Sequence, residues 1–470
     1  MRFMYFPAID NIADMISRLR EKLKKIYDSI ENKHLKKNLL NALPFWFGAL
    51  ITGLIAVLYA KLFAFAETGT NYIFHRAGWA FFLITPAAFT LSWWITKKSA
   101  PYAGGSGIPQ VSAAIELSVP KSNFMVSKLL SLRIVLVKII SSIVMVFGGG
   151  VIGREGPTIQ IAASVFKKIN DVLPEWYPKI SKRNMIVTGA AAGLASAFNT
   201  PLGGIVFAIE ELTKLHFSFF KSALLTGVII AGLTALHFLG PYLYLGYPKL
   251  GEFSLHVLWV VIPVALITGI GGSGMGRIIL AIFRKKRTLR KNYQKVIYTV
   301  LCGLAVAALA YFIDSRTFGS GKEIMQTALF TNHKQLEWYI PVLRVVGPIL
   351  SFSTGAAGGI FAPSLSAGAS IGAVIAGWFH LLPTETNLII LCGMTGFLTG
   401  ITRSPFTSSI LVIEMTNSHN VIFYLMLTAL LANIIANLVT SHSFYDHIKD
   451  QYIHEMYRGE MPEKIIARSH

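Results

Sequence analysis

Long apolar runs of about 20 residues recur along this chain of 470 residues, and each is long enough to span the hydrocarbon core of a bilayer as a helix. Charged residues make up only 14% of the chain, far below the roughly 25% of an average soluble domain. The sequence therefore predicts an all-α, multi-pass membrane protein that contacts membrane lipids. The spanning runs begin near Leu43, Phe219, Leu255, Val296, Trp338 and Val421.

Shorter apolar pieces, interrupted by glycine and proline, lie between the long runs. They include GGSGIPQVSAAIEL from residue 104, GPTIQIAASVF from residue 156 and GGIFAPSLSAGASIGAVIAGWF from residue 358. One such piece could be a loop or a kink in an ordinary bundle. Several together favour discontinuous helices, which are tolerated at membrane depth only where protein or a water-filled cavity surrounds them. We therefore expect half-helices around a central polar site.

An internal repeat organises the chain. The segment NTPLGGIVFAIEEL at 199–212 aligns with RSPFTSSILVIEMT at 403–416, which places Glu210 on Glu414. About 45 residues upstream of each copy stands a Gly-rich pentad that ends in proline, GREGP in the first and GIFAP in the second. Duplicated halves with broken segments in corresponding places predict a transporter whose binding site lies between the halves.

Basic residues give the chain a net charge of +20 and gather in the first 40 residues and in RKKRTLRK at 284–291. Because cytoplasmic loops carry an excess of Lys and Arg, we expect both segments in the cytoplasm. The first 40 residues have the pattern of an amphipathic surface helix and lack the form of a secretory signal peptide. Nucleic acid binding is the weaker interpretation, since the basic residues flank membrane spans.

The chain offers little for metal or enzyme chemistry. Cys302 and Cys392 lie inside apolar runs, as buried free thiols do, and the histidines are scattered without metal-ligand spacing. An intramembrane hydrolase would need a Ser-His pair, paired aspartates or a metal constellation among the spans, and we recognise none. We therefore expect neither an enzyme nor a metal or cofactor.

Three segments together, GSGIP at 105–109, GREGP at 153–157 and GGIFAP at 358–363, resemble the signature segments of the CLC family of chloride channels and chloride/proton antiporters. The tyrosine of SFYDHI and the stretch AAAGLASAFNTP from residue 190 also match, so the resemblance runs from about Phe45 to Tyr445. It implies a bundle of tilted and broken helices in two inverted repeats, whose half-helix N-termini converge on a central anion site.

This resemblance implies a domain division. We expect a cytoplasmic N-terminal segment over 1–40, a transmembrane domain over 41–445 with repeats at about 79–240 and 255–441, and a short cytoplasmic tail over 446–470. That tail is too short for the paired regulatory domains of many family members, so the chain resembles the short prokaryotic form. The family also implies a homodimer in which each subunit holds its own pathway.

The resemblance also implies the anion-binding residues. A helix N-terminus carries unsatisfied N–H groups and about half a positive charge, so it attracts anions without a buried cation. At the matching positions Ser106 and Tyr445 offer hydroxyls, while Ile360 and Phe361 offer backbone N–H groups. Alone, Ser106 would more simply be a helix cap and Tyr445 a packed aromatic. The set is completed by the glycines Gly107 and Gly156.

Glu155 of GREGP stands at a helix start, where a carboxylate is stabilised by the helix dipole. The resemblance implies more, namely a gate that occupies the anion site when ionised and leaves it when protonated. Glu211 matches the internal proton glutamate of the family, and its neighbour Glu210 is a candidate helper on the same path. Without the resemblance to the family, Glu211 and Glu210 would be interpreted equally well as a surface or salt-bridged pair at a helix end. Arg154 either attracts anions or pairs with a carboxylate.

We therefore predict an antiporter that exchanges chloride, its bound substrate, for protons in a bacterial inner membrane. The alternative is a passive chloride channel of the same fold. The gate Glu155 does not separate the two, because family channels also use a glutamate gate. Glu211 favours exchange, because many channel members lack a carboxylate at that position. The serine at position 106 favours chloride as the preferred anion.

Overall fold

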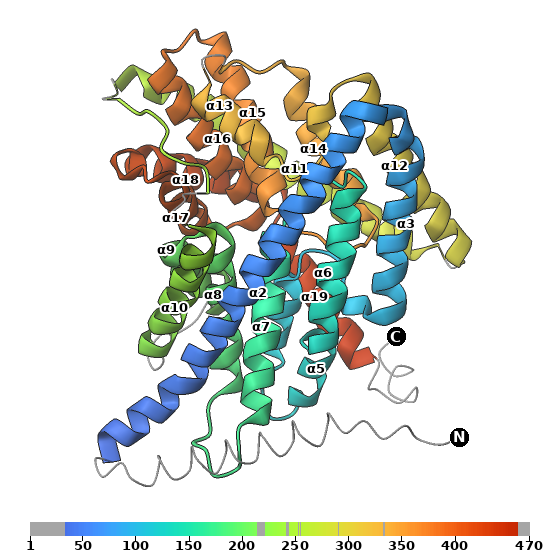
Figure 1. Cartoon of the computed structure of the whole chain (residues 1–470). Coiled ribbons are helices and arrows are strands. Elements are labelled where there is room, and N and C mark those ends of the chain that lie inside the picture. The colour runs from blue at the N-terminus through green and yellow to red at the C-terminus, as the bar shows by residue number, and fades with distance from the viewer. Residues whose placement is uncertain are drawn as a thin grey trace.

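The computed structural model describes residues 33–213, 221–240, 244–251, 253, 255–289, 291–331 and 334–458. Within these ranges the chain is helical, and its extended segments form only isolated bridges (Figure 1). Most of the expected N-terminal segment and the last residues of the tail lie outside the described ranges.

The first half contains α2 (Lys33–Ala77), α3 (Phe81–Ser99), α4 (Ile108–Glu116), α5 (Val126–Leu129), α6 (Leu132–Phe147), α7 (Glu155–Val172), α8 (Lys182–Phe198), α9 (Pro201–Phe207) and α10 (Lys221–Leu239). The second half contains α11 (Leu258–Arg287), α12 (Asn292–Phe312), α13 (Lys322–Phe330), α14 (Tyr339–Ser353), α15 (Phe361–Trp378), α16 (Pro383–Thr402), α17 (Pro405–Thr416), α18 (Ile422–Val439) and α19 (Phe444–Arg458).

Seven described helical stretches are long and apolar enough to cross a membrane, which confirms the multi-pass prediction. Two sequence expectations about length are wrong. The run from Trp338 forms α14, which has only 15 residues because the chain leaves the helix ahead of the Gly-rich stretch at 355–359. The piece at 358–379 forms α15, a continuous helix of 18 residues that is long enough to span.

Burial separates the central helices from the peripheral ones. The apolar window of α15 is 89% buried inside the protein, whereas that of α12 is only 33% buried and turns large side chains such as Leu301 outward. In α15 this burial depends on small residues, since a Cβ at Gly368 would lie 2.1 Å from the carbonyl oxygen of Gly393 in α16. The central helices therefore pack backbone to backbone, as small residues allow in membranes.

The helices form two halves that pack in the same pattern. In the first half α2 packs along α8 and α10, and α7 packs along α8. In the second half α11 packs along α16 and α18, and α15 packs along α16. We therefore propose that the first repeat begins with α2, earlier than the expected residue 79.

The short helices α9 and α17, which lie side by side in Figure 1, run in opposite directions. The carboxylate of Glu210, just beyond the end of α9, accepts backbone hydrogen bonds of 3.1 and 2.7 Å from Phe406 and Thr407 at the start of α17. The carboxylate of Glu414, near the end of α17, accepts 3.0 and 2.7 Å bonds from Leu202 and Gly203 at the start of α9. Each helix thus caps the other, as an inverted repeat requires.

Candidate functional site

The three Gly-rich segments meet at the centre of the protein and are joined by main-chain hydrogen bonds. The Gly105 N–H donates to the Ala356 carbonyl at 2.8 Å, and the Gly358 N–H donates to the Gly105 carbonyl at 3.1 Å. Gly153 and Gly359 exchange two such bonds, of 2.8 and 2.7 Å. The starts of α4, α7 and α15 are therefore joined directly by main-chain hydrogen bonds, which confirms that these helix N-termini converge.

Glycine is needed where the start of α4 touches that of α7. Gly107 is the N-cap of α4 with φ = +107°, a conformation that other residues rarely adopt. A Cβ at Gly107 would lie 2.9 Å from the Gly156 carbonyl oxygen, and one at Gly156 would lie 2.2 Å from the Ser106 hydroxyl. These contacts show both glycines as close-packing residues, while their role in anion binding stays a prediction.

Two buried hydroxyls stand at this junction. Ser106 and Tyr445 are each only 2% exposed, and neither hydroxyl oxygen has a hydrogen-bond partner among the described residues. The two side chains lie near each other, although Ser106 precedes α4 and Tyr445 lies in the first turn of α19. Buried polar groups are normally satisfied, so a hydroxyl without a partner is an available donor for a ligand.

The start of α15 adds backbone donors to the same junction. Ile360 and Phe361 are buried, and their N–H groups donate to no backbone carbonyl in the described part of the chain. The Phe361 ring packs against Tyr445 with a centroid separation of 6.3 Å. The four residues expected to hold an anion are thus brought together, with their hydroxyl and backbone N–H donors at one junction.

Glu155 is the first residue of α7, and its side chain is buried with 1% exposure. Its Oε1 accepts a 3.4 Å hydrogen bond from the hydroxyl of Tyr244, and the backbone amides of Glu155 itself and of Ala362 lie near the same carboxylate. The carboxylate therefore sits where the N-termini of α7 and α15 meet. An ionised group in that position can stand in for a bound anion.

Arg154 precedes Glu155 and is half-buried. One of its guanidinium nitrogens donates to the carbonyl of Ala197 at 3.5 Å, and the charge interacts with Glu155 and Lys322. Arg154 therefore lies within electrostatic range of the Glu155 carboxylate, and attraction of anions by its charge stays a prediction.

Glu211 and Glu210 have different surroundings although they are neighbours in a π-helical turn, Ala208–Thr213, that continues α9. Glu211 is 7% exposed and accepts a 2.7 Å hydrogen bond from the hydroxyl of Ser404. Glu210 instead caps α17 as described above. Tyr445 interacts electrostatically with both Glu211 and Glu155, so it lies within range of both carboxylates.

Sequence reasoning missed two buried cations, one that holds the junction and one that holds the loop ahead of α13. The ammonium of Lys138 in α6 donates to the Gly105 carbonyl at 3.0 Å, and its side chain is fully buried. The guanidinium of Arg344 in α14 is also fully buried, and it donates to the carbonyls of Thr317 and Gly319 at 3.0 and 3.2 Å. A lone basic residue inside an apolar run was the available signal, because such a charge is costly unless it has a role.

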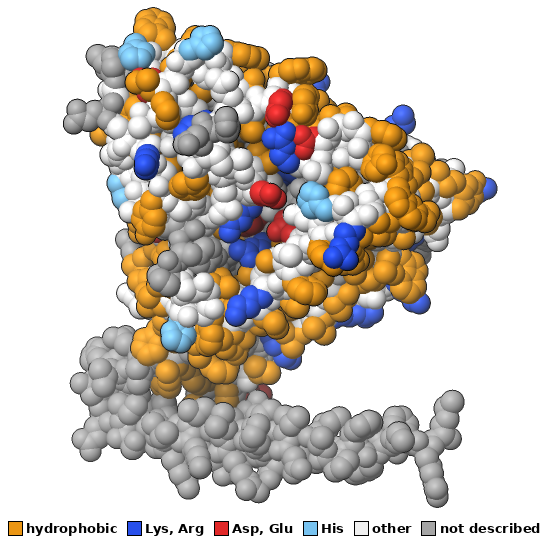
Figure 2. Space-filling view, turned by 45° about the horizontal axis from the view of Figure 1, so that its top comes forward, with side chains coloured by type: hydrophobic (Ala, Val, Ile, Leu, Met, Phe, Trp, Pro, Cys, Tyr) orange, Lys and Arg blue, Asp and Glu red, His pale blue; other side chains and the backbone are white. Residues whose placement is uncertain are grey.

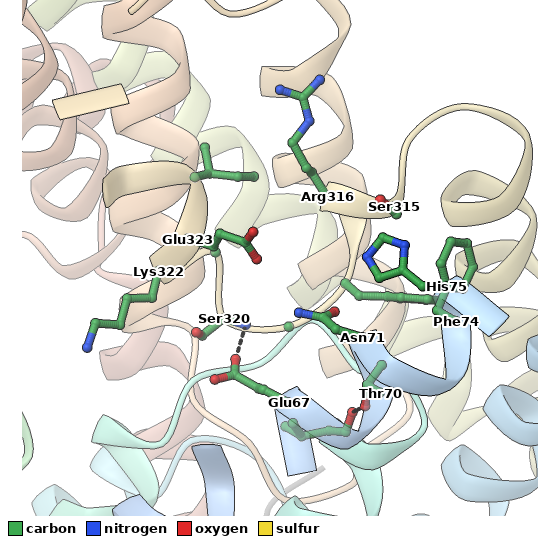
Figure 3. A pocket seen from close by; sticks show the side chains of 15 residues that line it. Glu67, Thr70, Asn71, Phe74, His75, Ser315, Arg316, Ser320, Lys322 and Glu323 are labelled. Atoms are coloured by element: carbon green, nitrogen blue, oxygen red, sulfur yellow. Dashed lines mark hydrogen bonds between the residues drawn. The ribbon is translucent and has the colours of Figure 1, made fainter. Parts of the chain in front are cut away.

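A pocket of about 220 Å³ opens beside the junction, between α2 and the loop that leads into α13 (Figure 3). Glu67 closes one side, where its carboxylate accepts a 2.9 Å hydrogen bond from the Ser320 N–H. Figure 2 shows charged side chains of both signs gathered in a hollow of the face that it draws, with hydrophobic side chains around it. Among the described residues, no group of three His, Cys, Asp or Glu side chains could hold a metal ion.

Comparison with known proteins gives a consistent result. The sequence model of the family described as "Voltage gated chloride channel" matches residues 88–437. The protein named "H(+)/Cl(-) exchange transporter ClcA" of Salmonella paratyphi B is 30% identical over 418 residues, which cover 85% of each chain. The protein of the same name from Salmonella newport shows the same identity and coverage.

Solved structures show the same fold. A structure described as a slow cyanobacterial Cl-/H+ antiporter superposes with a TM-score of 0.78 at 24% identity, over 88% of this chain and 98% of the other. A CLC-type fluoride/proton antiporter gives a TM-score of 0.72 at 20% identity, with coverage of 88% and 98%. A eukaryotic CLC transporter gives 0.71 at 19% identity, with coverage of 87% and 74%. The inverted-repeat bundle expected from the sequence is thus confirmed.

Proposed function

The chain belongs to the family of voltage-gated chloride channels, and on this premise we propose that it exchanges chloride for protons across the membrane. One observation carries the proposal: the buried carboxylate of Glu155 lies where helix N-termini meet, near the hydroxyls of Ser106 and Tyr445, which have no hydrogen-bond partner in the described part of the chain. The relatives whose names state H(+)/Cl(-) exchange support the same activity. A passive channel would need the gate but not a buried internal carboxylate such as Glu211.

The gate works by competition between two anions. Ionised Glu155 occupies the positive ends of α7 and α15 and so excludes chloride from them. Protonation removes the charge, and the neutral side chain no longer competes with chloride for the backbone donors. Chloride then binds between the hydroxyls of Ser106 and Tyr445 and the N–H groups of Ile360 and Phe361. One carboxyl group thereby gates the anion and carries the proton.

The proton leaves Glu155 toward the cytoplasm by way of Glu211. The Ser404 hydroxyl holds the Glu211 carboxylate in place. Because Tyr445 interacts with both carboxylates, the anion site lies close to the proton route. Chloride at the site keeps Glu155 away from it, so anion occupancy and proton transfer are coupled.

The assembly and orientation that we propose are those expected from the sequence. We propose a homodimer with one pathway per subunit in a bacterial inner membrane, with both termini in the cytoplasm. Its proposed substrates are chloride and protons, and we propose that it is not an enzyme and uses no cofactor. The family relation and the basic segments of the sequence support this arrangement.

The decisive experiment records chloride flux and pH together in liposomes that contain the protein. Glu155→Gln resembles a permanently protonated gate, and Glu155→Ala removes it. In both variants we expect chloride flux to persist, proton coupling to vanish and most of the pH dependence of flux to disappear.

A matched control is Glu175→Gln, which changes an exposed carboxylate in the loop after α7 and should leave coupling intact. If folded Glu155 variants still drive protons uphill on a chloride gradient, Glu155 is a helix-capping carboxylate and the proposal is wrong.

A further inference from the structure

We propose that Tyr244 is a positioning residue for the gate: its hydroxyl holds the ionised Glu155 carboxylate in the anion site and thereby sets the pH at which the gate opens. The inference rests on the proposed function, because it assumes that Glu155 titrates during transport. It adds a residue from the segment that joins the two repeats, outside all three Gly-rich signature segments.

The contact is buried and comes from an otherwise irregular segment. Tyr244 is 2% exposed, and its hydroxyl donates to Glu155 Oε1 at 3.4 Å. Its ring packs edge-to-face on Phe198, the last residue of α8, with a centroid separation of 4.9 Å. The ring is therefore fixed by packing, and the hydroxyl is directed at the gate rather than free to follow it.

A cation lies over the same ring. The ammonium of Lys322, at the start of α13, is 4.8 Å from the centroid of the Tyr244 ring. In Figure 3 the Lys322 side chain points away from Glu323 and from the interior of the pocket. A cation on the ring face withdraws electron density from the phenol, so the O–H becomes a stronger donor to a carboxylate. Lys322 thus acts on the gate directly by charge and indirectly through the tyrosine.

Other groups also act on Glu155, so a test of Tyr244 has to leave them unchanged. The charged or titratable side chains that interact with Glu155 are Arg154 next to it, Glu67 and Tyr59 from α2, Lys322 from α13 and Tyr445 from α19. Removing only the oxygen of Tyr244 leaves all of these charges in place. Tyr244→Phe therefore isolates the hydrogen bond.

The sign of the effect follows from the donor. A hydrogen bond to the charged form of a carboxyl group stabilises that form, so its loss favours protonation. In Tyr244→Phe, Glu155 should take up its proton at higher pH, and the pH of half-maximal chloride flux should rise. For a long hydrogen bond to a charged group, we expect a shift of roughly three- to tenfold in proton concentration.

The experiment compares the pH profile of chloride flux in liposomes for the wild-type protein, Tyr244→Phe and Tyr247→Phe. Tyr247 is the matched control, because it lies three residues along the same segment but is 68% exposed. Chloride binding measured by calorimetry at neutral pH gives a second readout. A gate that is held less firmly competes less, so Tyr244→Phe should bind chloride more tightly.

Lys322→Met tests the indirect route. Lys322→Met should raise the pH of half-maximal chloride flux, as Tyr244→Phe does. The shift should be smaller when Lys322→Met is made in the Tyr244→Phe variant, which already lacks the tyrosine hydroxyl. That non-additivity is what a shared path predicts.

The results separate this inference from the proposed function. Loss of pH dependence in Glu155→Gln, together with the profile shift in Tyr244→Phe, supports both. An unchanged profile and unchanged chloride affinity in folded Tyr244→Phe overturn the role of Tyr244 while the gate stands. If Glu155→Gln keeps the wild-type pH dependence, the gate itself fails, and any shift in Tyr244→Phe then arises elsewhere, which also overturns the inference.

Discussion

The hydroxyl of Ser404 donates a 2.7 Å hydrogen bond to Glu211, and the two residues belong to opposite repeats. Ser404 is the N-cap residue of α17, yet its side chain makes no cap bond to that helix. The side chain bonds instead to the Glu211 carboxylate, which is 7% exposed. A buried carboxylate that accepts from a hydroxyl is well suited to change its protonation state, because the hydroxyl can also accept a bond from the protonated form.

Glu211→Gln keeps the shape of the side chain but cannot take up a proton. We expect chloride flux to continue while chloride-driven pH changes disappear, as recorded by a pH electrode in liposomes. Glu175→Gln, an exposed carboxylate, is the control. Proton movement that persists at the wild-type rate would make Glu211 structural.

Glu210 and Glu414 form a matched pair that can test whether Glu210 helps the proton path. Both cap a helix of the opposite repeat through two backbone hydrogen bonds. Replacing either with Ala should lower the free energy of unfolding by about 1 kcal/mol, as loss of a helix cap does. Thermal unfolding in detergent measures this loss.

The Gln variants of the same pair address transport. A role of Glu210 in proton transfer predicts that Glu210→Gln slows proton movement while Glu414→Gln does not. Equal proton rates in the two variants would leave Glu210 as a cap only.

Ser106 should set the anion preference. Ser106→Pro removes a buried donor and alters the start of α4, so the flux ratio of chloride to nitrate should fall. Ser106→Ala should weaken chloride binding roughly fivefold, the typical effect of one hydrogen bond. The control is Ser112→Ala, because Ser112 in α4 also has a buried hydroxyl oxygen with no hydrogen-bond partner among the described residues. A flux ratio unchanged in folded Ser106→Pro would refute direct contact with the anion.

The orientation of the chain can be read from single cysteines. α12 has 21 residues and is long and apolar enough to cross a membrane, so we expect Lys285 before it and Glu337 after it on opposite sides. The native Cys302 and Cys392 are buried and can be replaced first. In intact cells an impermeant thiol reagent should label a cysteine at position 337 and spare one at position 285. The reverse pattern would invert the topology.

Local patterns predicted much of this site. The Gly-Pro pentads predicted helix starts because glycine permits close backbone approach and proline suits a first turn, and alignment of Glu210 with Glu414 predicted the repeat that the reciprocal caps now show. Tyr244 could not be predicted, since it belongs to no motif and meets Glu155 only through the tertiary fold. The length of α14 was misjudged because small and apolar residues continue past Ser353 into the Gly-rich stretch, whereas the helix ends at Ser353.

The main-chain bridges between Gly105 and Ala357 and between Gly153 and Gly359 have an evolutionary consequence. Because backbone supplies both the scaffold and many of the donors, substitutions of nearby side chains leave this framework standing. New ion preferences can then arise by single replacements at positions such as Ser106 without a search for a new fold. The glycines of these bridges should tolerate almost no replacement. A position that can vary, such as Ser106, therefore lies next to positions that cannot.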